Sequence, residues 1–294
     1  MFKFAAAAGG FVLAGALLAS PVAAPAALPA ARLSQPVLRL PARPAGAMAG
    51  SEFMRRTSGL SDADRDRAAV AEIERGNVPS FLARLTPVEI AGGASGSGVA
   101  ATLWVTPDYL AIGSDADFVY VPLSYPSATL VADRFGSVLP TAKMVDAIYE
   151  QSAHQLPPLP LPAGPQMRSN AYLSRHQQGI DAQRAGLPLG VLIAGHKKDL
   201  VLSNRLHRLP GRVAIYGWHR AADRPIQPLS TVHGAGYVDY SHGVRLVSAS
   251  VVVNGRVRSI YEALQDSLVA PVLSREGVTR DPWGLMHPST ARRH

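Results

Sequence analysis

Capping residues and apolar runs in the first half of the chain predict helices interrupted by short strands. Ser61-Asp-Ala-Asp64 is typical of a helix N-terminus, because a serine side chain and nearby acids satisfy the free N–H groups of the first turn. We expect this helix to end before Gly76. Apolar spacing of three and four residues predicts another helix over 141–149. Shorter helices are expected at 81–85 and 127–135, and strands at 99–106, 109–112 and 118–122.

The second half of the chain is predicted to be richer in strands. It opens with a polar helix over 171–185 and closes with a helix from Ser259 to about Val269. Strand-like runs cover 189–194, 212–216 and 244–253. Asn254-Gly255 follows the last run and favours a type I′ hairpin turn. The pattern therefore predicts an α+β fold, with a helical N-terminal region and a mainly antiparallel sheet concentrated in the C-terminal half.

The first 24 residues are typical of an export signal. A basic start at Lys3 precedes an apolar stretch of about 15 residues, and small residues resembling a cleavage site follow it. A stretch of this length is short for a membrane span, although a retained anchor is the alternative. We therefore expect an exported protein, located in the periplasm or outside the cell, with no integral membrane segment after processing.

Composition divides the rest of the chain into two halves and the segments around them. Residues 25–58 are rich in Ala and Pro and are expected to form a semi-extended linker. Prolines recur again in Leu156-Pro-Pro-Leu-Pro-Leu-Pro-Ala-Gly-Pro165, which predicts a stiff connector. The expected organisation is an N-terminal α+β half (59–155), a Pro-rich connector (156–166), a β-rich half with the candidate site (167–278) and a tail (279–294).

Residue usage limits the chemistry and the partners. The 294 residues include no cysteine, which excludes disulfides, thiolate metal ligands and a cysteine nucleophile. The net charge of +8 would suit an anionic or peptide-containing envelope polymer or lipid headgroups, but the arginines are scattered and solubility is the simpler explanation. The chain has neither a basic helix nor an aromatic ladder, so nucleic acid is not an expected partner.

The densest group of reactive side chains lies between Thr231 and Arg245. This stretch holds His233, Asp239 and His242 and leads directly into an apolar run. Histidines and a carboxylate at the edge of buried strands are typical of metal ligation or acid–base catalysis. Three such ligands and an open position for water would suit zinc, so His233, Asp239 and His242 are the predicted metal ligands.

A regular strand would separate two of these side chains. Asp239 and His242 are three residues apart and would face opposite sides of a sheet. The chain must therefore turn between them or nearby, and the glycines at 234, 236 and 243 make such a turn plausible.

The segment also resembles a known sequence pattern. Ser230-Thr-Val-His233-Gly-Ala-Gly-Tyr-Val-Asp239 is similar to the zinc D-alanyl-D-alanine peptidase pattern Ser-x-His-x-x-Gly-x-Ala-x-Asp. In that family the His and Asp bind zinc, and a second His follows a catalytic Glu. Here Ser230 lies one residue further from His233, Asp239 lies one residue closer to it, and no Glu-x-x-His follows. The resemblance implies zinc-dependent peptide hydrolysis as a chemistry and not membership of the family.

Two other histidines follow predicted strands. His196 comes after the run 189–194, and His219 after 212–216. Because the ends of adjacent strands converge, these two side chains and His242 could share one rim. Gly195-His-Lys-Lys-Asp199 holds two of the four lysines and could form an anion clamp or a base held by Asp199, although lysine pairs are common in solvated turns and a turn with both lysines pointing outward is the simpler explanation.

Other reaction types have weaker signals. A metal-free site could use His196 or His242 as a general base with a serine nucleophile, but no Gly-x-Ser-x-Gly elbow is present. Phosphate-binding and dinucleotide fingerprints are absent. Trp218 and Tyr237 could line a carbohydrate or peptide groove.

Two hypotheses follow. The first is an exported hydrolase that acts on a cell-envelope or extracellular polymer, with a peptide or amide bond favoured and zinc as a possible cofactor. The second is a non-catalytic envelope- or polymer-binding protein. The predicted catalytic residues are His196, Lys198, Asp199 and His242. The predicted substrate-binding residues are Trp218, His219, Tyr240 and Arg245.

Overall fold

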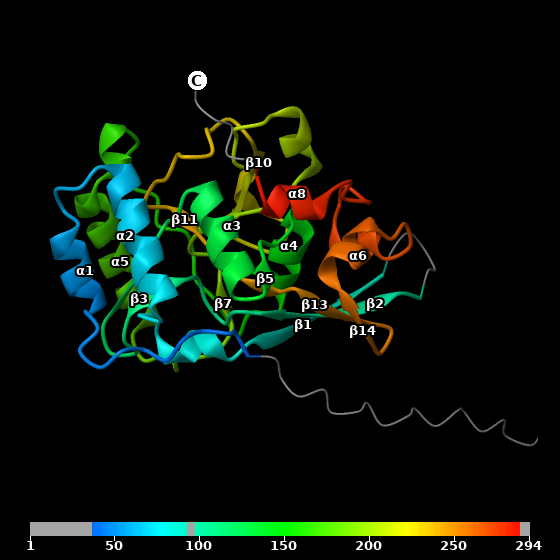
Figure 1. The fold of residues 1–294 in the computed structure, drawn as a ribbon, viewed down its shortest axis with the longest axis horizontal. Helices are drawn as coiled ribbons and strands as arrows, with labels where there is room; N and C mark the ends of the chain where they lie inside the picture. Colours follow the sequence, from blue (N-terminus) through cyan, green and yellow to red (C-terminus); the bar gives the residue numbers. More distant parts are fainter. Residues whose placement is uncertain (1–36, 93–97, 289–294) are drawn as a thin grey trace, which may run out of the picture. The chain divides into compact units, whose positions relative to one another are not determined.

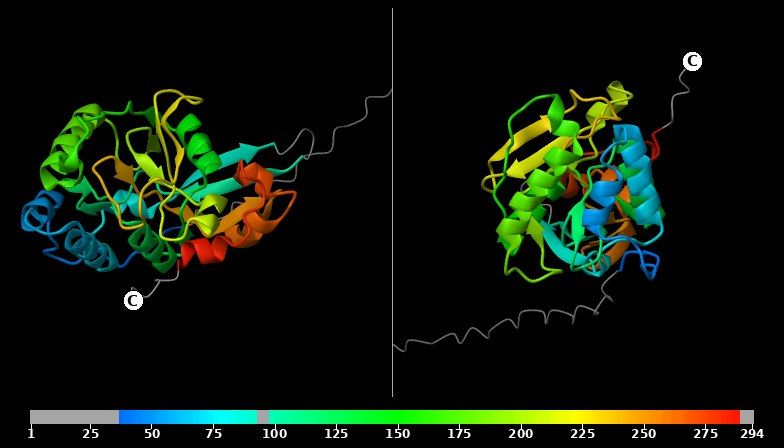
Figure 2. Two further views of the ribbon diagram at one scale, coloured as in Figure 1. Left: turned by 90° about the horizontal axis from the view of Figure 1, so that it is seen from above. Right: turned by 90° about the vertical axis from the view of Figure 1, so that its left-hand side faces the viewer.

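The computed structural model describes residues 37–92 and 98–288. The predicted export signal, the first part of the predicted linker and the end of the predicted tail lie outside these residues. The described residues form one compact unit (Figures 1 and 2). Within the described ranges, no helix combines the length and apolarity needed to cross a membrane.

The described residues form an α+β fold with mostly antiparallel sheets, as the sequence predicts. Helices α2 and α4 begin where predicted, and α3 begins two residues earlier than the predicted Ser127. Each has a capping hydroxyl group, from Ser61, Ser124 and Thr141, that accepts a hydrogen bond from a first-turn N–H. Helix α1 was not predicted and occupies the end of the predicted linker.

The helices are distributed along the whole described chain. They are α1 (Gly50–Arg56), α2 (Asp62–Glu74), α3 (Tyr125–Arg134), α4 (Ala142–Glu150), α5 (Asn170–Arg184), α6 (Ile260–Gln265), α7 (Ala270–Leu273) and α8 (Pro282–Met286), with 3-10 turns η1 (Ser80–Ala83), η2 (Pro165–Arg168) and η3 (Asn204–Arg208).

A six-stranded antiparallel sheet combines strands from both halves. It comprises β1 (Thr86–Ala91), β2 (Ala100–Val105), β5 (Ser137–Val138), β12 (Val247–Ser248), β13 (Ser250–Val253) and β14 (Arg256–Ser259), in the order β14-β13-β2-β12-β5 with β1 also paired to β2. The predicted hairpin is confirmed, because Asn254 (φ 47°) and Gly255 (φ 79°) both adopt positive φ between β13 and β14.

The predicted single strand over 244–253 is wrong in one respect. The run forms two strands, β12 and β13, which both pair with β2, and the chain belongs to a different sheet just before it. β11 (His242–Gly243) pairs with β8, and β12 and β13 then join the six-stranded sheet. This change of sheet places the polar segment before residue 244 at the end of a different, smaller sheet.

That smaller sheet has four strands and positions the candidate site. It comprises β8 (Lys198–Leu200), β9 (Ile215–His219), β10 (Pro225–Ser230) and β11, in the order β10-β9-β8-β11. The β8–β11 pair is parallel, and the other pairs are antiparallel. The predicted strand at 189–194 is shorter, since only β7 (Ile193–Ala194) forms, beside β6 (His154–Gln155); β3 (Ala111–Gly113) and β4 (Phe118–Tyr120) make a separate pair.

The Pro-rich connector is fastened to the C-terminal half. The Tyr240 hydroxyl accepts a hydrogen bond from the Leu161 N–H at 2.7 Å and lies 3.3 Å from the Leu161 carbonyl oxygen. The Leu156 N–H donates to the Ala194 carbonyl at 2.9 Å. These contacts extend the packing of the fold through the connector.

Candidate functional site

Six polar or aromatic side chains converge at the end of the four-stranded sheet. We call this group the His242 site: Lys198, Trp218, His233, Tyr237, Asp239 and His242. Strand pairing brings Lys198, Trp218 and His242 together, since Lys198 lies opposite His242 on β11 and opposite Gly217, the neighbour of Trp218, on β9. Residues 233–239 follow β10 and supply the rest of the group.

The turn that the sequence requires is present. The His242 N–H donates to the Asp239 carbonyl at 3.2 Å, so the chain reverses between the two residues. Their side chains therefore meet, with His242 Nε2 3.8 Å from Asp239 Oδ2. This distance is too long for a hydrogen bond, and the contact becomes an ion pair only when His242 is protonated.

Asp239 is held as an anion. Its Oδ1 accepts hydrogen bonds from Ser241 N (2.8 Å) and Ser241 Oγ (2.5 Å), and its Oδ2 accepts one from the Tyr237 hydroxyl (3.2 Å). Burial acts to raise the pKa of Asp239, but His242, the Ser241 hydrogen bonds and Lys198 outweigh it and hold the pKa below its ordinary value. The carboxylate thus carries a fixed negative charge at neutral pH.

His242 is a buried, neutral imidazole. It has no exposed surface, and burial lowers its pKa to about 4 despite the opposing effect of Asp239. Among the described residues, neither ring nitrogen makes a hydrogen bond. Unpaired polar groups are rare in protein interiors, and each one calls for an explanation.

His233 and Tyr237 form the solvent-facing side of the site. Both are half-buried, and their rings stack with centroids 4.0 Å apart and an interplanar angle of 7°. The His242 ring lies 6.5 Å from that of His233 and 5.7 Å from that of Tyr237. The exposed Arg168 guanidinium lies 5.5 Å from the centroid of the Tyr237 ring. A substrate would therefore meet His233, Tyr237 and Arg168 before reaching His242.

Lys198 and Trp218 close the other side. Burial lowers the pKa of Lys198, whereas Asp239 acts to raise it. Trp218 has φ 56°, a conformation uncommon for a residue with a Cβ, and its buried indole N–H has no partner among the described residues. Strained backbone of this kind is concentrated at functional sites.

His196 and Asp199, predicted to be catalytic, lie elsewhere in the core. His196 has no exposed surface; its Nε2 is 3.3 Å from Asp108 Oδ1, and its ring lies between those of Tyr109 and Tyr120. This contact is short but not aligned as a hydrogen bond. Asp199 Oδ2 accepts from the Tyr109 hydroxyl at 2.8 Å, and burial raises the pKa of Asp199 to about 6.

The expected common rim of three histidines does not form as one group. His219 Nε2 lies 3.0 Å from Asp146 Oδ1, which also accepts from the Tyr216 hydroxyl at 2.8 Å. His196, His219 and His242 therefore belong to three separate histidine–aspartate pairs. The reason is that each histidine packs against a different part of the fold, since Asp108 precedes β3, Asp146 lies on α4 and Asp239 lies in the turn before β11.

Tyr240 and Arg245, predicted to bind substrate, are core residues. Arg245 has no exposed surface, and its guanidinium donates to the carbonyls of Thr106 (2.8 Å) and Ile193 (2.6 Å). Tyr240 is buried and holds the connector. Neither side chain reaches the surface where a substrate would approach.

The zinc prediction has little support from ligand geometry. Within the described ranges, no three His, Asp or Glu side chains are grouped as a metal-binding set. Both oxygens of Asp239 already accept hydrogen bonds, and His233 stacks on Tyr237. Zinc binding therefore stays a prediction of the sequence.

Several residues around the site gave little sequence signal. Lys197, expected in one interpretation to point outward, is buried; its Nζ donates to the Tyr240 carbonyl at 2.7 Å and lies 3.2 Å from His176 Nδ1. Burial lowers the pKa of Lys197 to about 7. His176 comes from α5, about 60 residues before the site, and only the tertiary fold brings it close. The Lys-Lys pair beside His196 was the one available signal.

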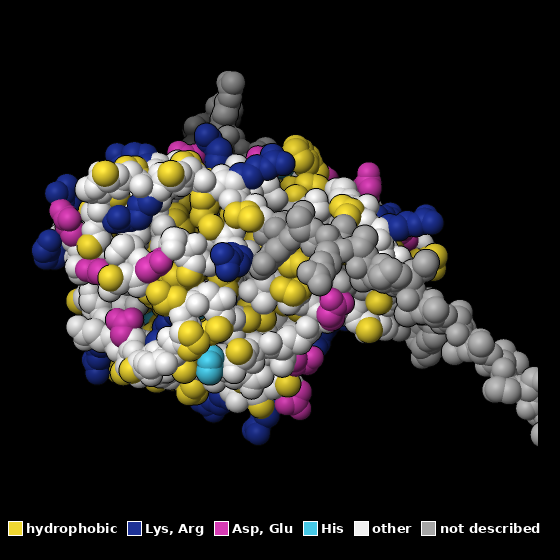
Figure 3. Space-filling view, turned by 90° about the horizontal axis from the view of Figure 1, so that it is seen from below, with side chains coloured by type: hydrophobic (Ala, Val, Ile, Leu, Met, Phe, Trp, Pro, Cys, Tyr) yellow, Lys and Arg dark blue, Asp and Glu magenta, His cyan; other side chains and the backbone are white. Residues whose placement is uncertain are grey.

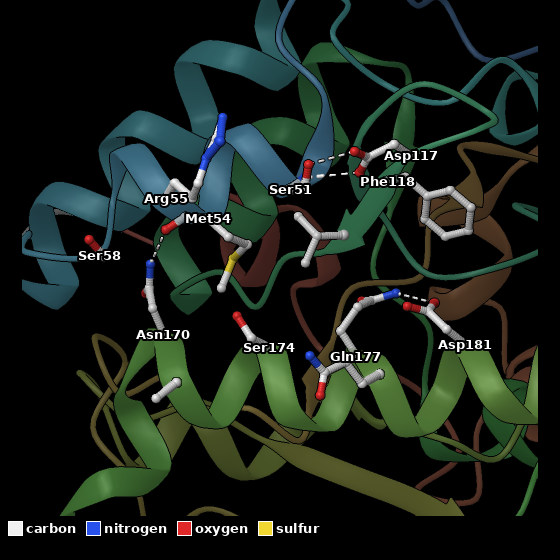
Figure 4. A pocket seen from close by; sticks show the side chains of 13 residues that line it. Ser51, Met54, Arg55, Ser58, Asp117, Phe118, Asn170, Ser174, Gln177 and Asp181 are labelled. Atoms are coloured by element: carbon white, nitrogen blue, oxygen red, sulfur yellow. Dashed lines mark hydrogen bonds between the residues drawn. The ribbon is translucent and has the colours of Figure 1, made fainter.

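A separate pocket lies between α1 and α5. It has a volume of about 620 Å³, and Asp117 and Asp181 on its wall accept hydrogen bonds from Ser51 and Gln177 (Figure 4). Of the residues that line it, none belongs to the His242 site. On the face shown in Figure 3, basic and acidic side chains are interspersed.

Comparison with known proteins gives no assignment of family. No protein-family model, curated protein or solved structure matches this chain.

Proposed function

We propose that the protein is a hydrolase of a cell-envelope or extracellular polymer, with the His242 site as its active site and an amide or ester carbonyl as the group attacked. One observation carries the proposal. Four chemically active side chains from two separate segments, Lys198 on β8 and His233, Asp239 and His242 after β10, meet where one imidazole is buried without a hydrogen-bonding partner among the described residues.

The arrangement supplies the groups that hydrolysis needs. His233 is the imidazole that solvent reaches, and burial lowers its pKa, so it is neutral and able to accept a proton from water. The water oxygen attacks the carbonyl carbon, and the ammonium group of Lys198 stabilises the negative charge that develops on the carbonyl oxygen. The protonated His233 then gives its proton to the leaving nitrogen or oxygen.

Asp239 and His242 are buried behind His233 and support its role. The fixed charge of Asp239 favours protonated His233 in the transition state and keeps Lys198 charged. His242 is a positioning residue, packed against Tyr237 and with its Nε2 3.8 Å from the Asp239 carboxylate. An export signal and the absence of cysteine are consistent with such an enzyme in the cell envelope.

Polymer binding without catalysis is the second candidate. It is favoured by two pairs of basic and aromatic side chains around the His242 site, Arg168 with Tyr237 and Lys198 with Trp218. Such pairs hold sugars or peptides without transferring protons.

Activity measurements on the full chain separate the two functions. The substrates are dye-labelled peptidoglycan sacculi and p-nitrophenyl acetate. We expect turnover by the wild type and a loss of about 100-fold or more in His233→Gln and Lys198→Met. His207→Gln is the matched control, because His207 is exposed and lies outside the site. Sedimentation with sacculi but no turnover would favour the binding function, and equal activity in all four proteins would remove the site from consideration.

A further inference from the structure

A second pocket carries a concentration of positive charge away from the residues of the His242 site. It has a volume of about 530 Å³ and is lined by Asn204, Arg205, His207, Arg208, Glu276 and Arg280, together with one leucine. We call it the Arg280 pocket. Three arginines face one glutamate, so the lining has a net charge of about +2 with His207 neutral.

The pocket is built from two segments that are joined by hydrogen bonds. Glu276 accepts from Ser203 Oγ (3.1 Å) and from the Asn204 N–H (2.9 Å). The Asn204 side chain in turn accepts from the Arg280 N–H (3.1 Å) and donates to the Val278 carbonyl (2.8 Å). The 3-10 turn η3 and residues 276–280 are therefore held together, although they are more than 60 residues apart in sequence.

These bonds leave most of the positive charge uncompensated. Glu276 makes a long ion-pair contact with Arg205, whose Nε lies 4.0 Å from its carboxylate, and Arg205 also donates to the Leu229 carbonyl. Within the described residues, the side chains of His207, Arg208 and Arg280 have no hydrogen-bonding or ion-pair partner. Elsewhere on the described surface some arginines pair with acids, as Arg56 does with Glu52 and Arg258 with Asp266, while single unpaired arginines such as Arg220 and Arg256 do not line this pocket.

We infer that the Arg280 pocket binds a phosphate group, either of a soluble phosphate compound or of a phospholipid headgroup. Guanidinium groups match phosphate oxygens with two parallel hydrogen bonds. A phosphomonoester carries a charge of about −1.5 to −2 near neutral pH and so balances the pocket, whereas a single carboxylate would not. This inference is independent of the proposed hydrolase activity, because the two sites share no residue.

Phosphate binding by the full chain tests the inference. Equilibrium dialysis with radiolabelled inorganic phosphate, in dilute chloride buffer, is expected to show saturable binding that weakens as salt is added. In the double variant Arg208→Gln/Arg280→Gln we expect affinity at least about tenfold lower, since each lost charge-assisted hydrogen bond contributes to binding.

A matched variant controls for overall charge. Arg220→Gln/Arg256→Gln removes the same charge from two exposed arginines outside the pocket and is expected to bind phosphate like the wild type. Equal weakening in both double variants, or no saturable binding by the wild type, would overturn the inference. Melting temperatures of both variants show whether each still folds.

Vesicles distinguish the source of the phosphate. Phosphatidylcholine vesicles with and without phosphatidic acid are sedimented with each protein. Retention that requires phosphatidic acid and is lost in Arg208→Gln/Arg280→Gln assigns the pocket to a phospholipid headgroup. Binding of free phosphate without vesicle retention assigns it to a soluble phosphate compound.

Discussion

The ammonium nitrogen of Lys198 lies 4.8 Å from the centroid of the Trp218 ring. This contact joins a lysine whose pKa is lowered by burial to a tryptophan in an uncommon backbone conformation, φ 56°. The aromatic face stabilises the charged form of the lysine. It therefore keeps a partly buried lysine protonated at the mouth of the proposed active site.

Replacing Trp218 should change the ionisation of Lys198. In Trp218→Leu the cation–π contact, about 0.5–2 kcal/mol, is lost and the pKa of Lys198 falls further. Trp218→Phe keeps an aromatic face and should fall between the leucine variant and the wild type. Carbon-13 NMR of labelled lysine across a pH titration measures this pKa. A Lys198 pKa unchanged in Trp218→Leu would show that the contact has no electrostatic effect.

Hydrolysis should depend on pH in a bell-shaped manner. His233 must be neutral to accept a proton. Burial lowers its pKa below the ordinary 6.5, so the acid limb of the profile has its midpoint below pH 6.5 and activity is full at neutral pH. Lys198 must be charged to stabilise the developing negative charge. Burial lowers its pKa, so the alkaline limb of the profile has its midpoint below pH 10.5. Rates of p-nitrophenyl acetate hydrolysis from pH 4 to 10 test both limbs. Loss of the alkaline limb in Lys198→Arg would identify the lysine, since arginine stays charged.

Chelation should leave the activity unchanged. The proposed proton transfers use side chains alone, so prolonged EDTA treatment is expected to have no effect on turnover. Zinc content by mass spectrometry completes the test. One zinc per chain that disappears in Asp239→Asn, together with activity lost on chelation and restored by zinc, would establish the metal site that the sequence suggests.

The Asp146 contacts should contribute to stability and not to activity. Asp146 binds His219 and Tyr216 and also pairs with Arg275 at 2.7 Å, which joins α4 to β9. Removing its charge in Asp146→Asn breaks a buried network and is expected to cost about 3–5 kcal/mol of unfolding free energy. Tyr216→Phe removes one hydrogen bond and should cost about 1 kcal/mol. Urea unfolding gives both values, and turnover per folded molecule should match the wild type.

Local sequence signals identified much of the secondary structure. The serine and acids at 61–64 cap α2, and Asn254-Gly255 forms the turn between β13 and β14. Both predictions are confirmed because capping and type I′ turns depend on a few adjacent residues. The longest predicted strand was wrong for the opposite reason. An apolar run does not reveal where a strand will break as its parts pair with different neighbours, here β12 with β5 and β13 with β14.

The candidate site was predicted only in part. The sequence brought His233, Asp239 and His242 into one hypothesis because they are close along the chain, and it required a turn before His242 that the structure contains. Lys198 and Trp218 were suspected separately, and no local pattern showed that they would meet these residues. His196, His219 and Arg245 were also predicted to take part in the site, but each is buried in the core and bound to other residues.

The sequence by itself determined the residue types available for chemistry, the α+β class and the local turn that joins Asp239 to His242. Only the tertiary structure decided which of those side chains share a site. The pairing of β8 with β11 and β9 is a long-range contact that adds Lys198 and Trp218 to the group. Burial then separates the histidines by role, because a side chain enclosed in the core stabilises packing while one at the surface, such as His233, remains open to a substrate.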